Sequence, residues 1–156
     1  MSTTFTLRFT RLLSLACLFI SCLAANTLQA QSDALVGPKK WDKPGVIMTS
    51  ANGMYEFRYE ENGNVSLYMF YKEMNFVTKK EEDRFTILWN TSTKGKDHVL
   101  FFENGELKIE QNGKRLWTNG LVTSEQTKMV LTNNGNLLVL NAEGIPLWDT
   151  GTYRVN

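Results

Sequence analysis

The chain has 156 residues, of which 17 are basic, 16 are acidic, one is histidine and two are cysteine. Basic and acidic residues are almost equal in number, so the chain lacks the excess of positive charge that binds nucleic acid or an anionic membrane surface. Neither is expected as a partner. A single histidine also falls short of the ligand clusters that hold zinc, and no metal or other cofactor is expected.

Residues 1–30 have the three-part pattern of a secretory signal peptide. Two arginines supply the positive start, residues 12–25 form an apolar run that is short for a bilayer span, and Ala30 is a small residue before the predicted cut. An N-terminal membrane anchor and a lipoprotein cut before Cys22 are the alternatives. We expect a secreted, periplasmic or cell-surface protein with no membrane span after cleavage.

The mature chain is expected to contain no cysteine, because Cys17 and Cys22 both leave with the signal. Removing the two arginines of the signal from the 17 basic residues leaves 15 against 16 acidic residues, a net charge of −1. Stability must then come from burial and hydrogen bonding rather than from disulfides. Residues 31–45 contain two prolines and are expected to form an extended lead-in to a single domain over residues 46–156.

Beyond residue 48, Asn-Gly pairs separate short runs in which apolar and polar residues alternate. Asn-Gly favours the tight turn of a β-hairpin, because both residues tolerate a positive φ. Alternation such as that of Val65, Leu67 and Met69 gives a strand one buried face. No segment has a capped helical stripe, so an all-β domain is predicted. The pairs begin at Asn52, Asn62, Asn104, Asn112, Asn119 and Asn134.

Three units share one order: a hairpin around Asn-Gly, then Leu-Trp and a short polar stretch. Their tryptophans, Trp89, Trp117 and Trp148, lie 28 and 31 residues apart, which indicates an internal repeat about one axis. One such hairpin cannot bury its apolar face alone, so we expect the three tryptophans to be buried together in a shared core. The interval from hairpin to tryptophan is much longer in the first unit, and residues 71–84 are predicted to be an inserted, protruding hairpin.

Residues 129–140, continued by residues 146–152, resemble the repeat of the bulb-type, mannose-binding lectins of monocot plants, and residues 50–55 resemble the start of that domain. The similarity covers residues 46–152. The resemblance implies a β-prism (type II) of three four-stranded antiparallel sheets with pseudo-threefold symmetry. It also implies that the three tryptophans lie near the axis.

The sugar site of that family follows the pattern Gln-x-Asp-x-Asn-x-Val-x-Tyr, in which short polar side chains at alternate positions converge on one face. The resemblance implies a site for mannose or a mannose-containing glycan, and it is best kept in the first repeat, where Asn64 and Tyr68 match. In the third repeat only Asn136 matches, and the second repeat matches nowhere. The candidate carbohydrate-binding residues are Glu60, Asn62, Asn64 and Tyr68 in the first repeat and Asn134 and Asn136 in the third.

Each of these residues also has a purely structural interpretation. Asn-Gly needs no ligand to explain it, and Glu60 can pair with Arg58 or with a lysine on the surface. His98 beside Asp97 is interpreted as part of a solvated turn, and without a second histidine or a cysteine it forms no triad, so the protein is not expected to be an enzyme. We therefore expect a carbohydrate-binding module. The alternative is a β-prism that has lost sugar binding and acts as a structural or protein-interaction module; self-association as a homo-oligomer stays open.

Overall fold

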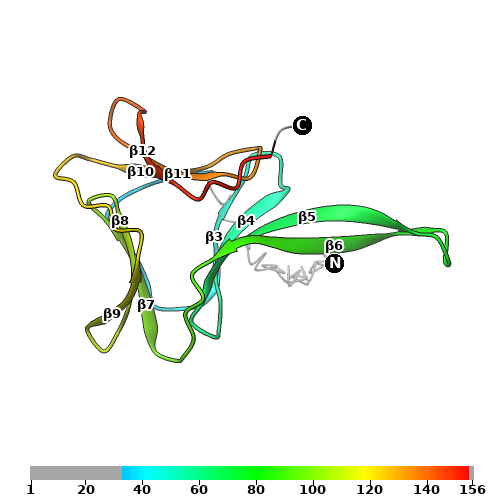
Figure 1. The fold of residues 1–156 in the computed structure, drawn as a ribbon, viewed down its shortest axis with the longest axis horizontal. Coiled ribbons are helices and arrows are strands. Elements are labelled where there is room, and N and C mark those ends of the chain that lie inside the picture. The colour runs from blue at the N-terminus through cyan, green and yellow to red at the C-terminus, as the bar shows by residue number, and fades with distance from the viewer. Residues whose placement is uncertain (1–32, 155–156) are drawn as a thin grey trace, which may run out of the picture.

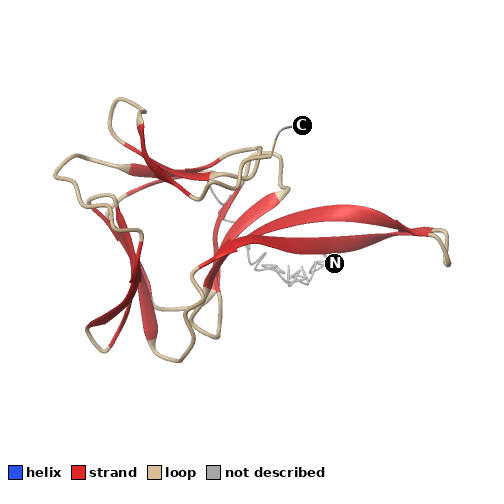
Figure 2. Ribbon diagram, in the orientation of Figure 1, coloured by secondary structure: helices blue, strands red, loops and turns tan. Residues whose placement is uncertain are grey.

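The computed structural model describes residues 33–154, and the predicted signal peptide, residues 1–30, lies outside that range. The described chain forms three separate four-stranded antiparallel sheets that enclose one core (Figures 1 and 2). This arrangement confirms the all-β prediction and the β-prism of three sheets. Within the part of the chain that the structure describes, no helix long and apolar enough to span a bilayer occurs.

Each sheet is built from one repeat and one strand of the N-terminal segment. The repeat-one sheet contains β3 (Gly45–Thr49), β4 (Tyr55–Tyr59), β5 (Val65–Asn75) and β6 (Lys80–Asn90). The repeat-two sheet contains β2 (Lys39–Trp41), β7 (His98–Glu103), β8 (Glu106–Gln111) and β9 (Lys114–Thr118). The repeat-three sheet contains β1 (Ala34–Val36), β10 (Lys128–Leu131), β11 (Leu137–Leu140) and β12 (Pro146–Asp149).

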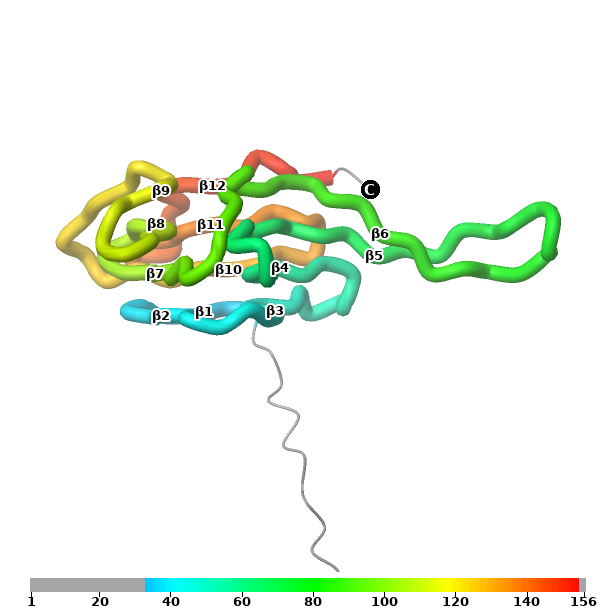
Figure 3. The backbone as a smooth tube through the Cα atoms, turned by 90° about the horizontal axis from the view of Figure 1, so that it is seen from below, coloured from blue at the N-terminus to red at the C-terminus, as the bar shows by residue number. Residues whose placement is uncertain are grey.

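The strands stack in four tiers along the prism axis, each tier taking one strand from every sheet (Figure 3). The N-terminal strands β1, β2 and β3 form the first tier, and β12, β9 and β6 form the last. Residues 34–36 and 39–41, within the predicted lead-in, form β1 and β2, which are hydrogen-bonded to β10 and β7. The three repeats are tied together by this segment, because it crosses from one sheet to the next.

The strand registers align one inward-facing residue of each tier into a row. The rows are Met48, Phe57, Leu67 and Trp89 in the repeat-one sheet, Trp41, Leu100, Ile109 and Trp117 in the repeat-two sheet, and Leu35, Met129, Val139 and Trp148 in the repeat-three sheet. The side chains of the two middle tiers are fully buried. Because side chains alternate between the two faces of each strand, every repeat contributes an equivalent row of inward-facing residues to the core.

The three repeat tryptophans meet at one end of the prism, as predicted. The ring centroid of Trp89 lies 5.4 Å from that of Trp117 and 6.2 Å from that of Trp148, both pairs edge to face. They are half-buried rather than buried, because they belong to the last tier, which no further strand covers. Trp41 belongs to the first tier and packs against the core at the other end.

The first repeat carries the predicted insertion. Strands β5 and β6 have 11 residues each and stay paired as far as Asn75 and Lys80, so the hairpin projects well beyond the prism (Figure 1). Its tip exposes Phe76 and Val77, whose relative accessibilities are 88% and 92%. The prediction of a protruding hairpin of lengthened strands is confirmed.

Candidate functional site

A concave site lies on the outer face of the repeat-one sheet, where the β4–β5 hairpin meets the edge strand β3. Its volume is about 340 Å³. Its polar wall consists of Arg58 on β4, Tyr68 on β5 and two glutamates of the turn between these strands, and the start of β3 supplies an apolar wall. The lining residues are Pro44, Gly45, Val46, Arg58, Tyr59, Glu60, Glu61 and Tyr68. We refer to it as the repeat-one pocket.

Two of the predicted sugar-site residues come together in this pocket. The Tyr68 hydroxyl donates a hydrogen bond of 2.8 Å to Oε1 of Glu60. Burial, followed by the hydrogen bond to Glu60, raises the pKa of the Tyr68 phenol above its usual 10.0, and the protonated phenol is the donor of this bond. The second carboxylate oxygen of Glu60 is left to accept from a ligand hydroxyl.

Arg58 forms the cationic part of the pocket. Its guanidinium pairs with Glu56, so the expected alternative pairing of Glu60 with Arg58 is wrong: Glu60 binds Tyr68 instead. The guanidinium carbon also lies 5.5 Å from the ring centroid of Tyr68 and 5.3 Å from that of Phe70. Stacking of this kind holds a flexible cation in place, which positions its outer N–H groups beside the pocket.

The other two predicted residues of the first repeat lie in the turn and not among the pocket's lining residues. Oδ1 of Asn62 accepts the backbone N–H of Asn64 at 2.9 Å, which stabilises the turn. Asn64 donates from its amide to Ser66 Oγ at 3.0 Å, and its Oδ1 accepts from Thr91 Oγ1 at 2.9 Å. The two polar ends of the Asn64 side chain are therefore engaged in folding.

Thr91 is the centre of this local network. Its hydroxyl oxygen also accepts the backbone N–H of buried Val65 at 3.1 Å, and the hydroxyl of Thr93 donates to the Gly63 carbonyl at 2.7 Å. We call this pair the threonine latch of repeat one. The latch explains why threonines occupy the second and fourth positions after Trp89. This spacing is visible in the sequence, but the pattern of turns and tryptophans does not reveal its role.

Repeat three repeats the latch. Thr150 Oγ1 accepts from the Leu137 N–H at 3.1 Å and donates to Asn136 Oδ1 at 2.9 Å, and the Thr152 hydroxyl donates to the Gly135 carbonyl at 2.6 Å. Asn136 is only 7% exposed, so the single family match of this repeat has a structural role. In the second repeat Asn119 replaces the first threonine, and its Oδ1 accepts from the Leu107 N–H.

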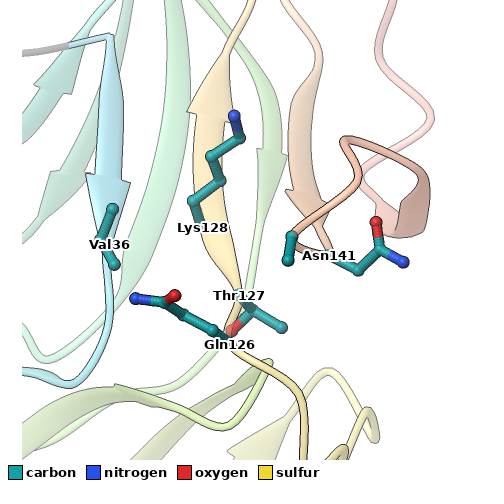
Figure 4. Close-up of a pocket in the computed structure, with 6 residues that line it drawn as sticks. Val36, Gln126, Thr127, Lys128 and Asn141 are labelled. Atoms are coloured by element: carbon teal, nitrogen blue, oxygen red, sulfur yellow. The ribbon is translucent and has the colours of Figure 1, made fainter.

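Asn134 is exposed and accepts a hydrogen bond from the Thr132 hydroxyl. The repeat-three sheet does have a hollow of about 180 Å³, which Val36, Gln126, Thr127, Lys128, Asn141 and Ala142 line (Figure 4). It lies where β10 begins and β11 ends, whereas Asn134 and Asn136 lie in the turn that joins the two strands at the opposite end. The structure thus separates both predicted residues of repeat three from this hollow.

The interpretation of His98 as part of a solvated turn is wrong. Its side chain is 2% exposed and lies beneath the Asn62–Gly63 turn, with Nδ1 3.0 Å from the Gly63 carbonyl oxygen. A Cβ at position 63 would lie 2.1 Å from Nδ1 of His98, so only glycine leaves room for the ring. Across residues 33–154, no group of three or more His, Cys, Asp and Glu side chains is arranged to hold a metal ion.

Comparisons with known proteins agree with the fold. No protein-family model matches the chain, and neither does any curated protein. Among solved structures, a Marasmius oreades lectin has a TM-score of 0.59 and 22% identity over 78% of this chain and 92% of its own. A monomeric monocot mannose-binding lectin from Gastrodia elata has a TM-score of 0.58 and 20% identity over 79% of this chain and 100% of its own. A Polygonatum cyrtonema lectin complexed with monomannoside has a TM-score of 0.51 and 18% identity over 78% of this chain and 98% of its own. At these identities the likeness establishes the β-prism lectin fold alone.

Proposed function

We propose that the protein is an exported carbohydrate-binding module, and that the repeat-one pocket is its sugar site. The observation that carries the proposal is the junction of Glu60 and Tyr68 inside a concavity of the outer sheet face, at the hairpin where the family pattern is best kept. Two structural neighbours, one named a mannose-binding lectin and one complexed with monomannoside, support mannose as the first ligand to test.

The pocket offers the kinds of groups that a hexose needs. The free carboxylate oxygen of Glu60 accepts from a hydroxyl, Arg58 donates, and Val46 faces ring carbons from the edge strand. Asn62 and Asn64 are not assigned a contact with the sugar, because neither lines the pocket. With only a few hydrogen bonds of about 0.5–1.5 kcal/mol each, we expect a monosaccharide to bind with a Kd of roughly 1 mM.

Calorimetry with mannose on the mature chain tests this assignment. Tyr68→Phe removes only the hydroxyl that meets Glu60, and Glu60→Ala removes the acceptor; both are expected to weaken binding several-fold. Tyr71→Phe is the matched control, since Tyr71 lies on the same strand but alternates to the opposite face. Equal heats for the wild type and both pocket variants would remove the repeat-one pocket from consideration.

The export part of the proposal is tested separately. We expect the mature protein to begin at Gln31 and to be recovered outside the cytoplasm. N-terminal sequencing and the intact mass of the natural protein measure this directly. A mature chain that still begins at Met1, or one that begins with a lipid-modified Cys22, would replace the cleaved, soluble form with an anchored one.

The second candidate function is protein binding by a β-prism without a working sugar site. The observation that favours it is the exposure of Phe76 and Val77 at the end of the projecting hairpin. A glycan array discriminates between the two candidates. An array with no bound glycan, at protein concentrations well above the expected Kd, would place protein binding first.

A further inference from the structure

We propose that the repeat-one pocket continues onto an aromatic strip along the base of the β5–β6 hairpin, and that the ligand is an oligosaccharide whose additional sugar rings stack on this strip. The strip consists of Tyr68, Phe70, Phe85 and Ile87. This inference deepens the proposed function and rests on it. It names a chain of sugars, rather than a single residue, as the ligand of the same site.

The strand register places all four side chains on one face. Tyr68 is opposite Ile87 and Phe70 is opposite Phe85, and residues that face each other across a ladder point to the same side. The ring centroid of Phe85 is 5.6 Å from that of Tyr68 and 6.2 Å from that of Phe70. The three rings are therefore in mutual contact and present one continuous apolar surface.

This surface is accessible within the described structure. Phe85 is 61% exposed and Ile87 is 45% exposed, whereas Leu67, which precedes Tyr68 and alternates to the inner face, is fully buried. None of the four side chains belongs to the buried core or to the partly buried residues that pack against it. Their exposure is an observation that a ligand contact explains.

Tyr68 joins the strip to the pocket. Its hydroxyl binds Glu60 in the pocket, while its ring lies against Phe85 in the strip. Arg58 makes the second connection, since it lines the pocket and lies over the rings of both Tyr68 and Phe70. A ligand that leaves the pocket in the direction of the hairpin meets Arg58, which lies over the rings of Tyr68 and Phe70, and then the exposed ring of Phe85.

The size and the borders of the strip favour a carbohydrate over a protein. A specific protein interface buries about 800 Å² per partner and involves 20–30 residues, which four side chains on two strands cannot supply. Charged residues border the strip: Arg58 and Glu56 on β4, and the opposed pair Lys72 and Asp83 further along the hairpin. A sugar chain matches this layout, since its rings have apolar C–H faces for stacking and hydroxyls at their edges for charged groups.

Binding measurements with α-linked mannose oligomers of one to four residues test the inference. For the wild type we expect affinity to rise about three- to tenfold from mannose to the trimer, a gain of the size of an aromatic contact. Phe85→Ala is expected to abolish this gain, so that the variant binds the trimer no more tightly than it binds mannose. Phe85→Leu keeps an apolar side chain without the ring and is expected to lose most of the gain.

The hairpin tip supplies the matched control. Phe76→Ala removes an aromatic ring that is even more exposed but lies at the tip, and it should leave all affinities unchanged. A wild type that binds mannose with no gain for longer oligomers, or a gain that survives Phe85→Ala, overturns the inference and leaves the proposed pocket intact. Failure of the wild type to bind any of the sugars overturns both.

Discussion

Replacing Thr91 with valine tests whether the threonine latch holds the first repeat together. Valine has nearly the same shape and suits a strand end, so the change removes the hydroxyl and little else. That hydroxyl accepts from the Val65 N–H at 3.1 Å and donates to Asn64 Oδ1 at 2.9 Å. Both bonds are lost together, in a place where Thr91 is 8% exposed and Val65 is fully buried.

The size of the effect follows from what is left unpaired. A buried N–H without an acceptor costs about 1–3 kcal/mol, and the lost bond to Asn64 adds about 0.5–1.5 kcal/mol. The new methyl group returns roughly 0.8 kcal/mol if it is buried. We expect the free energy of unfolding to fall by about 2 kcal/mol in Thr91→Val, and by a similar amount in Thr150→Val, because repeat three has the same latch.

Urea denaturation followed by tryptophan fluorescence measures the change, because the three tryptophans of the last tier report on the prism as a whole. The control is Thr86→Val, a half-buried threonine on β6, which should alter stability by no more than about 0.5 kcal/mol. Effects at positions 91 and 150 should also be additive, since the two latches share no partner. A loss at Thr91 no larger than that at Thr86 would refute the latch.

Three further predictions concern other parts of the molecule. Gly63→Ala should lower the free energy of unfolding, measured by urea denaturation, far more than Gly53→Ala does. Both glycines have a positive φ, but only a Cβ at position 63 would collide with His98. Adding His98→Ala to Gly63→Ala should therefore restore part of the lost stability. The free energy of unfolding should fall as the pH rises above 10.0 and through the raised pKa of Tyr68 in the folded state, because the folded protein holds this phenol proton more tightly than the unfolded chain does. Phenolate absorbance follows the titration, and thermal unfolding should show a smaller loss of stability at alkaline pH in Tyr68→Phe. Replacing residues 74–81 by Asn-Gly, which joins the opposed Glu73–Glu82 pair, should shorten the hairpin and change the circular dichroism and the free energy of unfolding little.

The fold could be predicted because its determinants are local and are repeated. Asn-Gly turns and period-two alternation fix hairpins and their buried faces, and the even spacing of Trp89, Trp117 and Trp148 fixes the number of sheets. The long interval in the first repeat predicts the projecting hairpin for the same reason. The partial exposure of the tryptophans could not be predicted, because it depends on which tier of strands lies at the end of the prism. The order of the tiers depends in turn on how the three N-terminal strands are divided among the three sheets.

The candidate site was harder to predict, since its contacts join residues that are distant in sequence. Asn64 matches the family pattern, yet it is held by Thr91, which lies 27 positions further along the chain. Arg58 lines the pocket because its strand pairs with β5, where the ring of Tyr68 lies beneath its guanidinium. His98 was misjudged because charged neighbours suggest solvent, whereas the space beneath Gly63 exists only in the folded structure.

The most direct test of the account is a crystal structure of the mature protein with an α-linked mannose trimer. We predict density for one sugar in the repeat-one pocket against Glu60 and Tyr68, with the next ring over Phe85. Sugar bound at Asn134 and Asn136 instead, or crystals whose repeat-one pocket stays empty at saturating trimer, would contradict the central claim that this β-prism binds carbohydrate through its first repeat.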